Sequence, residues 1–303
     1  MGVDHRTVLV TGATGKQGGS VVRHMLGRGW ALRALTRDPS TRAAQALADK
    51  GVELVRGDLE DVSSLEAAVR GVHGVYSVQD FWPVGAKREV MQGKNLAGVA
   101  VKAGVEHFVY SSVGGAERNS GIDHWDSKWE IEKHIRKLGL PATVLRPVAF
   151  MEGYYGEQVE IGILQGKLFY PIRADKPYQT IASDDIGGFV ALAFDRPKDS
   201  IGLELEIAGS ELTGLEAAEV FSRVLGKPVQ YQELPIPTDK EYYQMFRWFN
   251  ESGFQANIGE LRGRYPRSSF RHSRSGFITR GGQTRAALRC TQGINFDRNG
   301  PIR

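Results

Sequence analysis

One stretch near the N-terminus, VLVTGATGKQGGSVV, places a glycine-rich turn between an apolar run and a segment with a helical pattern. Its spacing is G-x-x-G-x-x-G. The first glycine permits a sharp turn, the second lets main chain approach a diphosphate, and the third allows close packing of helix on strand. The first amides of such a helix, with its dipole, form an anion site without a charged side chain. The turn predicts dinucleotide binding, and the alternative is a turn that serves packing alone. The expected contacts are Gly12, Thr14, Gly15, Gln17 and Gly18.

From residue 7 to about residue 146, short apolar runs alternate with amphipathic segments. Near-continuous apolar strands with helical crossovers are typical of a parallel sheet covered by helices on both faces. Six strands in this arrangement predict an α/β fold with a doubly wound, Rossmann-type sheet. The expected strands are 7–11, 31–36, 52–56, 74–78, 107–112 and 142–147, and the expected helices are 16–28, 40–50, 62–70, 86–103 and 125–138.

After residue 146 the alternation loosens, which indicates a smaller C-terminal α/β lobe. Helices are expected at 154–166, 183–195, 212–226 and 239–253, and an alternating strand at 203–209. The third of these helices opens with Thr213 and Glu216 in capping-box spacing and stops at Gly226. We expect a Rossmann domain at 1–150 and a lobe for substrate or partner at 151–262, with some of its chain returning to the main sheet.

The basic excess of the chain is confined to its end. The formal net charge is +4, but residues 263–303 hold nine arginines and one acid, so the first 262 residues carry 30 basic and 34 acidic side chains. A nucleic-acid interpretation would depend on these last residues alone, and we expect no nucleic-acid partner. The segment 263–303 has neither helical nor strand periodicity and is expected to be disordered. An altered reading frame at the end of the gene would produce the same composition.

Other classes are disfavoured by what the composition lacks. A single cysteine, Cys290, allows no internal disulfide and no thiolate cluster, and seven histidines without ligand spacing predict no metal site. No apolar run approaches the ~18 residues of a membrane span, and no secretory signal is evident. We therefore expect a cytoplasmic protein without membrane contact. Neither a Gly-x-Ser-x-Gly elbow nor a Walker A lysine occurs.

The end of the second expected strand, LTRDPS, carries the residues that select a cofactor. A ribose-binding acid is expected about 20 residues after the glycines. Here Arg37 follows the strand, and its guanidinium can stack on adenine and hold a 2′-phosphate. This favours NADP over NAD, although a shift of one residue would place Asp38 there instead. After the third strand, GDLED places Asp58 and Leu59 near the adenine, with a helix cap as the alternative for Asp58.

Together, several motifs resemble those of the NmrA-like proteins, atypical relatives of the short-chain dehydrogenases, over about residues 5–260. The motifs are TGATGKQGGSVV, LTRDPS, GVELVRGDLED, FVYSSVGGAER, LPATVLRPVAFME and DDIGGFVALAFDRP. The resemblance implies an NAD(P)-binding Rossmann domain, a small C-terminal domain and a cleft between them. The family includes NADP-binding redox sensors and regulators as well as NADPH-dependent quinone and isoflavone-type reductases. The resemblance does not extend beyond Gly263.

The segment HWDSK departs from the usual catalytic pair of this superfamily, Tyr-x-x-x-Lys, in which lysine lowers the phenol pKa and holds the nicotinamide ribose. His124 stands at the Tyr position and Lys128 at the Lys position, one helical turn apart. Lys128 is expected to bind the ribose. His124 beside an ammonium group is a poor proton donor, and a cap or surface role is its alternative. Ketone reduction is therefore not expected, whereas quinone reduction can take its proton from water.

Further cleft candidates follow the later strands, because ligands bind beyond the carboxyl ends of parallel strands. They are Gln79, Phe81 and Trp82 after the fourth strand, Ser111, Ser112 and Val113 after the fifth, and Pro147, Val148, Phe150 and Met151 after the sixth. Packing between domains is the alternative for the apolar members. The aromatic residues of 239–253 are expected to pack in the core.

Two functions remain open at this point. The first is an NADPH-dependent reductase of quinones or similar conjugated carbonyls. The second is a sensor of NADP(H) occupancy that acts on a regulatory protein partner. A sensor needs different affinities in two conformers rather than a proton donor, so the missing tyrosine favours it.

Overall fold

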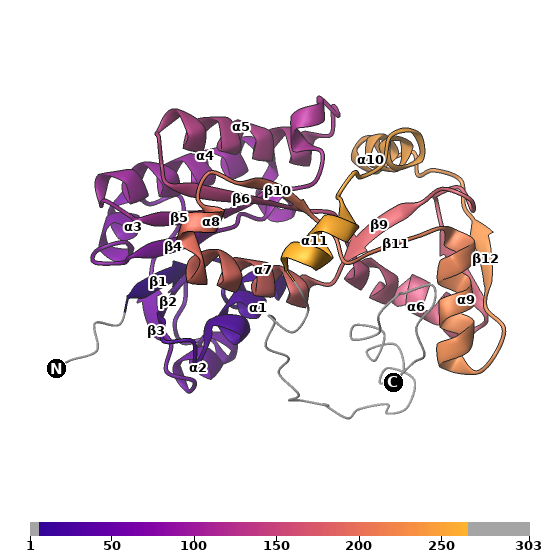
Figure 1. Cartoon of the computed structure of the whole chain (residues 1–303), viewed down its shortest axis with the longest axis horizontal. Coiled ribbons are helices and arrows are strands. Elements are labelled where there is room, and N and C mark those ends of the chain that lie inside the picture. Colours follow the sequence, from indigo (N-terminus) through magenta and orange to yellow (C-terminus); the bar gives the residue numbers. More distant parts are fainter. Residues whose placement is uncertain (1–5, 266–303) are drawn as a thin grey trace. The chain divides into compact units, whose positions relative to one another are not determined.

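The computed structural model describes residues 6–265, which divide into two compact units (Figure 1). The first unit contains residues 6–147, 183–206 and 262–265, and the second contains residues 148–182 and 207–261. The chain thus leaves the first unit after Pro147, returns at Ser183 and leaves again after Glu206. Most of the segment expected to be disordered, from residue 266 onward, lies outside the described residues.

Seven strands form the central sheet of the first unit in the order β10-β6-β5-β4-β1-β2-β3. β1 pairs in parallel with β2 on one side and with β4 on the other. The strand order therefore reverses at β1, as in a doubly wound sheet, which confirms the predicted fold class. The strands are β1 (Thr7–Val10), β2 (Ala31–Thr36), β3 (Glu53–Arg56), β4 (Gly74–Ser77), β5 (His107–Ser111), β6 (Ala142–Pro147) and β10 (Glu204–Ile207).

The first six strands lie where the apolar runs predicted them, and β10 corresponds to the alternating segment expected at 203–209. The structure places β10 at the edge of the main sheet, where the amide of Gly202 donates to Ala142 O at 2.7 Å and that of Val144 donates to Leu203 O at 2.8 Å. Residues 183–206 thus complete the first unit although they follow part of the second in sequence.

Helices cover both faces of this sheet (Figure 1). α4 and α5 pack together on one face, where Leu96 and Ile131 are fully buried, and α1 packs against α7 on the other. The approach of α1 and α7 is close, since a Cβ atom at Gly187 would lie 2.2 Å from Ser20 Oγ. The helices are α1 (Lys16–Met25), α2 (Arg42–Ala48), α3 (Val62–Ala68), α4 (Phe81–Lys102), η1 (Ala116–Arg118), α5 (Asp123–Lys137), α7 (Ser183–Asp195) and α8 (Pro197–Ser200).

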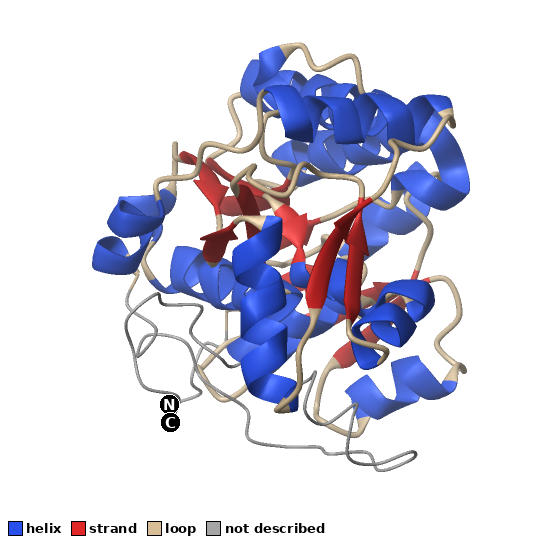
Figure 2. Cartoon of the chain, turned by 90° about the vertical axis from the view of Figure 1, so that its right-hand side faces the viewer, coloured by secondary structure: helices blue, strands red, loops and turns tan. Residues whose placement is uncertain are grey.

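The second unit contains a three-stranded sheet, β11-β9-β7, and a two-stranded sheet, β12-β8, with α9 beside the latter (Figure 2). The predicted capping box of α9 is confirmed, because Thr213 Oγ1 accepts from the Glu216 amide at 3.2 Å and Glu216 Oε2 accepts from the Thr213 amide at 2.9 Å. The elements are β7 (Ala149–Phe150), η2 (Met151–Tyr155), α6 (Glu157–Leu164), β8 (Lys167–Tyr170), β9 (Tyr178–Ile181), β11 (Ser210–Leu212), α9 (Gly214–Leu225), β12 (Gln230–Glu233), α10 (Lys240–Glu251) and α11 (Ile258–Arg264).

Three expectations differ from the structure. None of the five strands that the structure describes in the second unit was predicted from the sequence, because each spans only two to four residues, too few to show alternation. α4 begins at Phe81 rather than at residue 86, with Gly85 in a non-helical conformation (φ 73°, ψ 170°) inside it. α11 runs through Gly263 to Arg264, and the Tyr265 ring packs 5.2 Å from that of Phe189, so the ordered chain passes the expected start of the tail.

Candidate functional site

The carboxyl ends of β1, β2, β3 and β4 border a cavity of about 400 Å³ within the first unit. Ligands of doubly wound sheets bind at this position, beside the strand where the order reverses. Six of the predicted binding residues line the cavity, namely Gly12, Thr14, Arg37, Asp58, Leu59 and Gln79.

The glycine turn forms one end of the cavity, and its backbone explains the spacing of the motif. Gly12 has a φ of 60°, a left-handed conformation that favours glycine. A Cβ atom at Gly18 would lie 2.3 Å from Gly12 O and 2.6 Å from Thr11 O, so only glycine fits there. α1 has Gly15 as its N-cap, without a side-chain cap, and no acid in its first turn. Its first amides and the positive end of its dipole are therefore suited to an anion.

The loop after β2 places a cation and a restrained acid on the same wall. Arg37 and Asp38 both line the cavity. Asp38 Oδ1 accepts from the Ser40 amide at 2.9 Å and from Ser40 Oγ at 2.7 Å. These hydrogen bonds lower the pKa of Asp38, so the group remains a carboxylate engaged with its own loop. Arg37 has no ion-pair partner among residues 6–265.

The cavity lining also contains a polar cluster that the sequence did not predict. Glu60, which follows β3, accepts from Arg88 Nε at 2.8 Å and from Gln92 Nε2 at 2.9 Å, and all three line the cavity. The hydrogen bonds from Gln92 and then Arg88 lower the pKa of Glu60. Asp58 is not the cap of α3, since Asp61 holds that position, and Asp58 Oδ1 instead accepts from the Glu60 amide at 2.9 Å. No local motif signals this cluster, because its partners are separated by 28 and 32 residues.

The segment after β4 carries an incompletely bonded amide and two aromatic rings, which pack against His124 of α5. Gln79 is 5% exposed, and its Nε2 donates to Ser77 Oγ at 3.0 Å, but its Oε1 has no hydrogen-bond partner within the described part of the chain. Phe81 and Trp82 lie in the first turn of α4, with ring centroids 5.5 and 5.4 Å from that of His124. His124 therefore belongs to an aromatic group, and neither it nor Phe81 lines the cavity.

Lys128 is held by a buried acid that sequence reasoning missed. Its Nζ donates to Glu89 Oε1 at 2.7 Å and to Gln79 O at 3.4 Å. Ser127 Oγ donates to the other oxygen of Glu89. The Glu89 side chain is fully buried and that of Lys128 is 12% exposed, so the pair is largely shielded from solvent. Lys128 does not line the cavity itself, but it contacts the backbone of Gln79, which does.

Four other predicted cofactor-binding residues do not line the cavity. Gln17 Oε1 accepts from Ser111 Oγ at 2.7 Å and from the Tyr76 hydroxyl at 3.4 Å, which ties α1 to β4 and β5. Pro147 O accepts from the Gly114 amide at 2.9 Å. Gly15, Gly18, Gln17 and Pro147 are outside the cavity lining.

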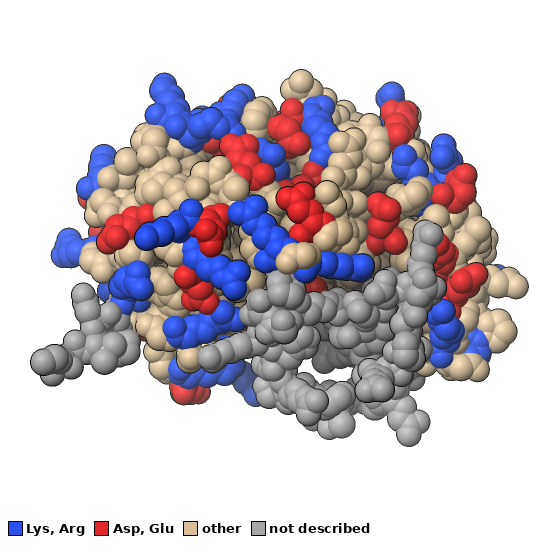
Figure 3. All heavy atoms as spheres, viewed as in Figure 1, with Lys and Arg blue, Asp and Glu red and all other residues tan. Residues whose placement is uncertain are grey.

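Surface charge, possible metal ligands and the apolar character of the helices bear on other kinds of site in the described part of the chain. Figure 3 shows one face of the molecule, on which basic and acidic side chains are interspersed over the described residues. Among residues 6–265, no group of three or more His, Cys, Asp or Glu side chains is arranged to hold a metal ion. Within the same residues, no helix combines the length and apolar character needed to cross a bilayer.

Comparison with known proteins gives consistent relationships. An NmrA-like family domain-containing protein of Dictyostelium discoideum is 30% identical over 272 residues, covering 82% of this chain and 88% of its own. NmrA, a negative transcriptional regulator solved with NADP, has a TM-score of 0.73 at 22% identity, covering 88% of this chain and 93% of its own. An NADPH-dependent quinone oxidoreductase from Escherichia coli, solved with NADPH, has a TM-score of 0.67 at 22% identity. The match covers 85% of this chain and 99% of the oxidoreductase. At such identities the two structures show a shared fold. Because the model of the NmrA-like family matches residues 4–264, this chain belongs to the NmrA-like family.

Proposed function

We propose that the protein binds NADP(H) in the cavity at the carboxyl ends of β1 to β4. The observation that carries the proposal is that Gly12 and Thr14 line this cavity and the uncapped N-terminus of α1 follows directly at Gly15, so that its main-chain amides can hold a diphosphate without a charged side chain. The close contact at Gly18 and the left-handed Gly12 support the fit, because both keep side chains away from the approach.

Two features of the loop after β2 favour NADP over NAD. Arg37 lines the cavity without an ion-pair partner among the described residues, so its guanidinium is available to a 2′-phosphate. The carboxylate of Asp38, which would hold the 2′-hydroxyl of NAD, is engaged by Ser40. The sequence alone left these two residues in competition, and the loop geometry supports Arg37.

On the nicotinamide side, Lys128 and Gln79 are the groups we expect to hold the cofactor. Gln79 brings a buried oxygen without a partner in the described chain, which fits a ligand that donates a hydrogen bond. Lys128 already directs its ammonium group toward Gln79 O and can share it with ribose hydroxyls. When bound, NADPH would supply a hydride. Glu89 holds the Lys128 side chain in a place that is largely shielded from solvent.

We propose that the reaction is reduction of a quinone or a similar conjugated carbonyl. His124, which stands at the position of the usual tyrosine, packs among Phe81 and Trp82. A ketone would then lack its acid, whereas the oxyanion of a quinone is delocalised and can be protonated by water. The quinone oxidoreductase of the same fold is consistent with this choice.

The second candidate is a non-catalytic sensor of NADP(H) occupancy that acts on a regulatory protein. The observation that favours it is the same His124, because binding needs no proton donor. NmrA, a transcriptional regulator of the same fold, was solved with NADP. Both candidates share the cofactor site and differ only in turnover.

A titration followed by a turnover assay tests both parts. Isothermal calorimetry with NADP and NAD should show tighter binding of NADP, and absence of binding by either at millimolar concentration would remove the site assignment. NADPH oxidation is then followed over a panel of quinones, with the Lys128→Ala variant as the control. Turnover that is lost in the variant supports the reductase. Binding without turnover on any quinone supports the sensor.

A further inference from the structure

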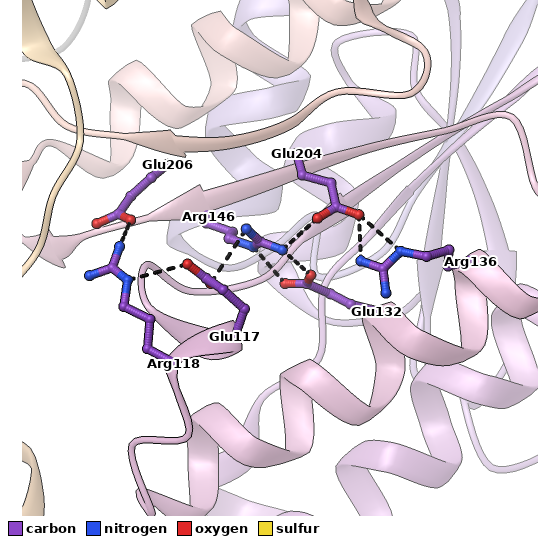
Figure 4. Close-up of polar contacts among 7 residues, drawn as sticks. All are labelled: Glu117, Arg118, Glu132, Arg136, Arg146, Glu204 and Glu206. Atoms are coloured by element: carbon purple, nitrogen blue, oxygen red, sulfur yellow. Dashed lines mark hydrogen bonds and ion pairs between the residues drawn. The ribbon is translucent and has the colours of Figure 1, made fainter.

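Seven charged residues form a connected cluster at the edge of the first unit, with Arg146 of β6 at its centre (Figure 4). Arg146 Nε donates to Glu132 Oε1 at 3.0 Å, and its Nη2 donates to Glu132 Oε2 at 2.6 Å and to Glu204 Oε2 at 2.8 Å. Its Nη1 lies 3.4 Å from Glu117 Oε2. The outer members of the cluster are Arg118, Arg136 and Glu206.

The ion pair between Arg146 and Glu132 at the centre of the cluster is buried, so its formation carries a large desolvation cost. The side chains of Arg146 and Glu132 are 9% and 0% exposed. Desolvation of two charges largely cancels their attraction, and hydrophobic residues of similar volume often stabilise a protein as well or better. A two-pronged guanidinium–carboxylate contact does, however, restrict the relative orientation of the elements that carry it. The geometry thus indicates that the pair orients the elements that carry it, rather than adding to the free energy of unfolding.

The elements that Arg146 aligns are those that lead to the cofactor site. Glu132 lies on α5 four residues after Lys128, so the two side chains project from neighbouring turns on the same side of the helix. Glu117 lies on η1, in the loop that joins β5 to α5. At the other side, Ser127 and Lys128 are held by Glu89 of α4. α5 is therefore fixed by one buried ion pair to β6 and by another to α4.

We propose that Arg146 is a positioning residue: by holding Glu132 and Glu117 it sets the rotation of α5 about its axis, and so directs the Lys128 ammonium group to the nicotinamide half of the bound dinucleotide. The inference rests on the proposed function, in which Lys128 binds the ribose. Arg146 itself does not line the cavity. Substitution of Arg146 should therefore weaken binding of the nicotinamide half of the ligand and leave binding of the adenosine half unchanged.

Arg136 provides a matched control within the same cluster. It lies on α5, donates to Glu204 Oε1, and has its guanidinium 5.2 Å from the Trp129 ring, compared with 5.7 Å for Arg146. Arg136 and Arg146 thus both contact Glu204 and Trp129. Arg136, however, forms no ion pair with Glu132 or Glu117. Arg136→Lys therefore removes an arginine from the cluster and weakens only the half-exposed contact of α5 with Glu204, while the buried contact between Arg146 and Glu132 stays in place.

The experiment compares two ligands in the full-length protein. Calorimetry measures Kd for NADPH and for adenosine 2′,5′-bisphosphate, which has the adenosine half alone. In Arg146→Lys and in Glu132→Gln, the Kd of NADPH should rise about tenfold, the order expected for loss of one hydrogen bond to a charged group. The Kd of the bisphosphate should stay constant, and Arg136→Lys should change neither. In a Lys128→Ala background, Arg146→Lys should have no further effect.

Circular dichroism first confirms that each variant is folded, and either conservative variant suffices for the comparison. Equal weakening of both ligands would overturn the inference, because it would mean general loosening of the unit. Unchanged NADPH binding in a folded variant would overturn it as well. If the unmodified protein binds the bisphosphate but Lys128→Ala leaves NADPH binding intact, the role of Lys128 fails and this inference with it. If the unmodified protein binds neither NADPH nor the bisphosphate, the proposed function itself fails.

Discussion

The contact between Gly18 and the turn before it supports a quantitative prediction. In Gly18→Ala, the new Cβ atom would lie 2.3 Å from Gly12 O, 2.4 Å from Gly12 C and 2.6 Å from Thr11 O. Carbon and oxygen atoms in close contact are normally about 3.3 Å apart, so α1 would have to move by roughly 1 Å. All three neighbours are backbone atoms of a turn with φ of 60° at Gly12, and no side chain can rotate away to make room.

The expected cost follows from these contacts. Overpacking of an interior costs about 1–3 kcal/mol, and rigid backbone neighbours place this site at the upper end. Alanine in place of glycine in a helix recovers about 0.5–1 kcal/mol. The free energy of unfolding should therefore fall by about 2 kcal/mol. The displaced amides of α1 should also bind NADP more weakly.

Gly98 in α4 is the control, since a Cβ atom there meets nothing within 4 Å. Gly98→Ala should leave stability unchanged or raise it by about 0.5–1 kcal/mol for the same helical reason. Urea denaturation followed by circular dichroism measures both variants, and calorimetry with NADP measures the binding. A Gly18→Ala protein that is as stable as Gly98→Ala would refute the close-packing role of Gly18.

Three further predictions concern the cofactor, the proton and the pH. Arg37→Ala should weaken NADP binding by about tenfold or more, as expected for a lost charged contact, and leave NAD nearly unchanged; calorimetry that shows equal losses would contradict the assignment. His124→Tyr should raise NADPH-dependent ketone reduction if the missing acid limits it, and a cofactor-loaded variant with no gain would count against this account. Burial alone would raise the pKa of Asp184, but hydrogen bonds from His24 and Arg23 outweigh it and lower it to about 2. The stabilisation by Asp184 should therefore be complete above pH 3.8 and lost as the pH falls toward 2, and Asp184→Asn should flatten urea-measured stability across that range.

Local patterns predicted the parts of this protein that depend on neighbours in sequence. Six strands lie where apolar runs placed them, because strands covered on both faces are mostly apolar. The capping box at Thr213 and the turn at Gly12 were equally readable, since each depends on spacings of a few residues. The cavity then follows from topology, because parallel strands bring their carboxyl ends to one edge.

Partners far apart in sequence were not predictable in this way. Glu89 and Lys128 are 39 residues apart, and nothing in the neighbourhood of Glu89 marks it as the acid that holds the lysine. The same holds for Glu60 with Arg88, and for Arg146 with Glu204. Each pairing arises only when packed helices and strands place two side chains at bonding distance.

The sequence by itself thus indicated six strands of the sheet, the doubly wound fold class and the glycine turn, since hydrophobic period and glycine spacing act over short distances. Only the tertiary structure decided that β10 completes the sheet, that Asp38 is engaged by Ser40 beside a cavity that Arg37 also lines, and how Lys128 is held. The physical reason is that a buried charged side chain is oriented by the partner that tertiary packing places beside it. The sequence separation between the two partners follows no rule.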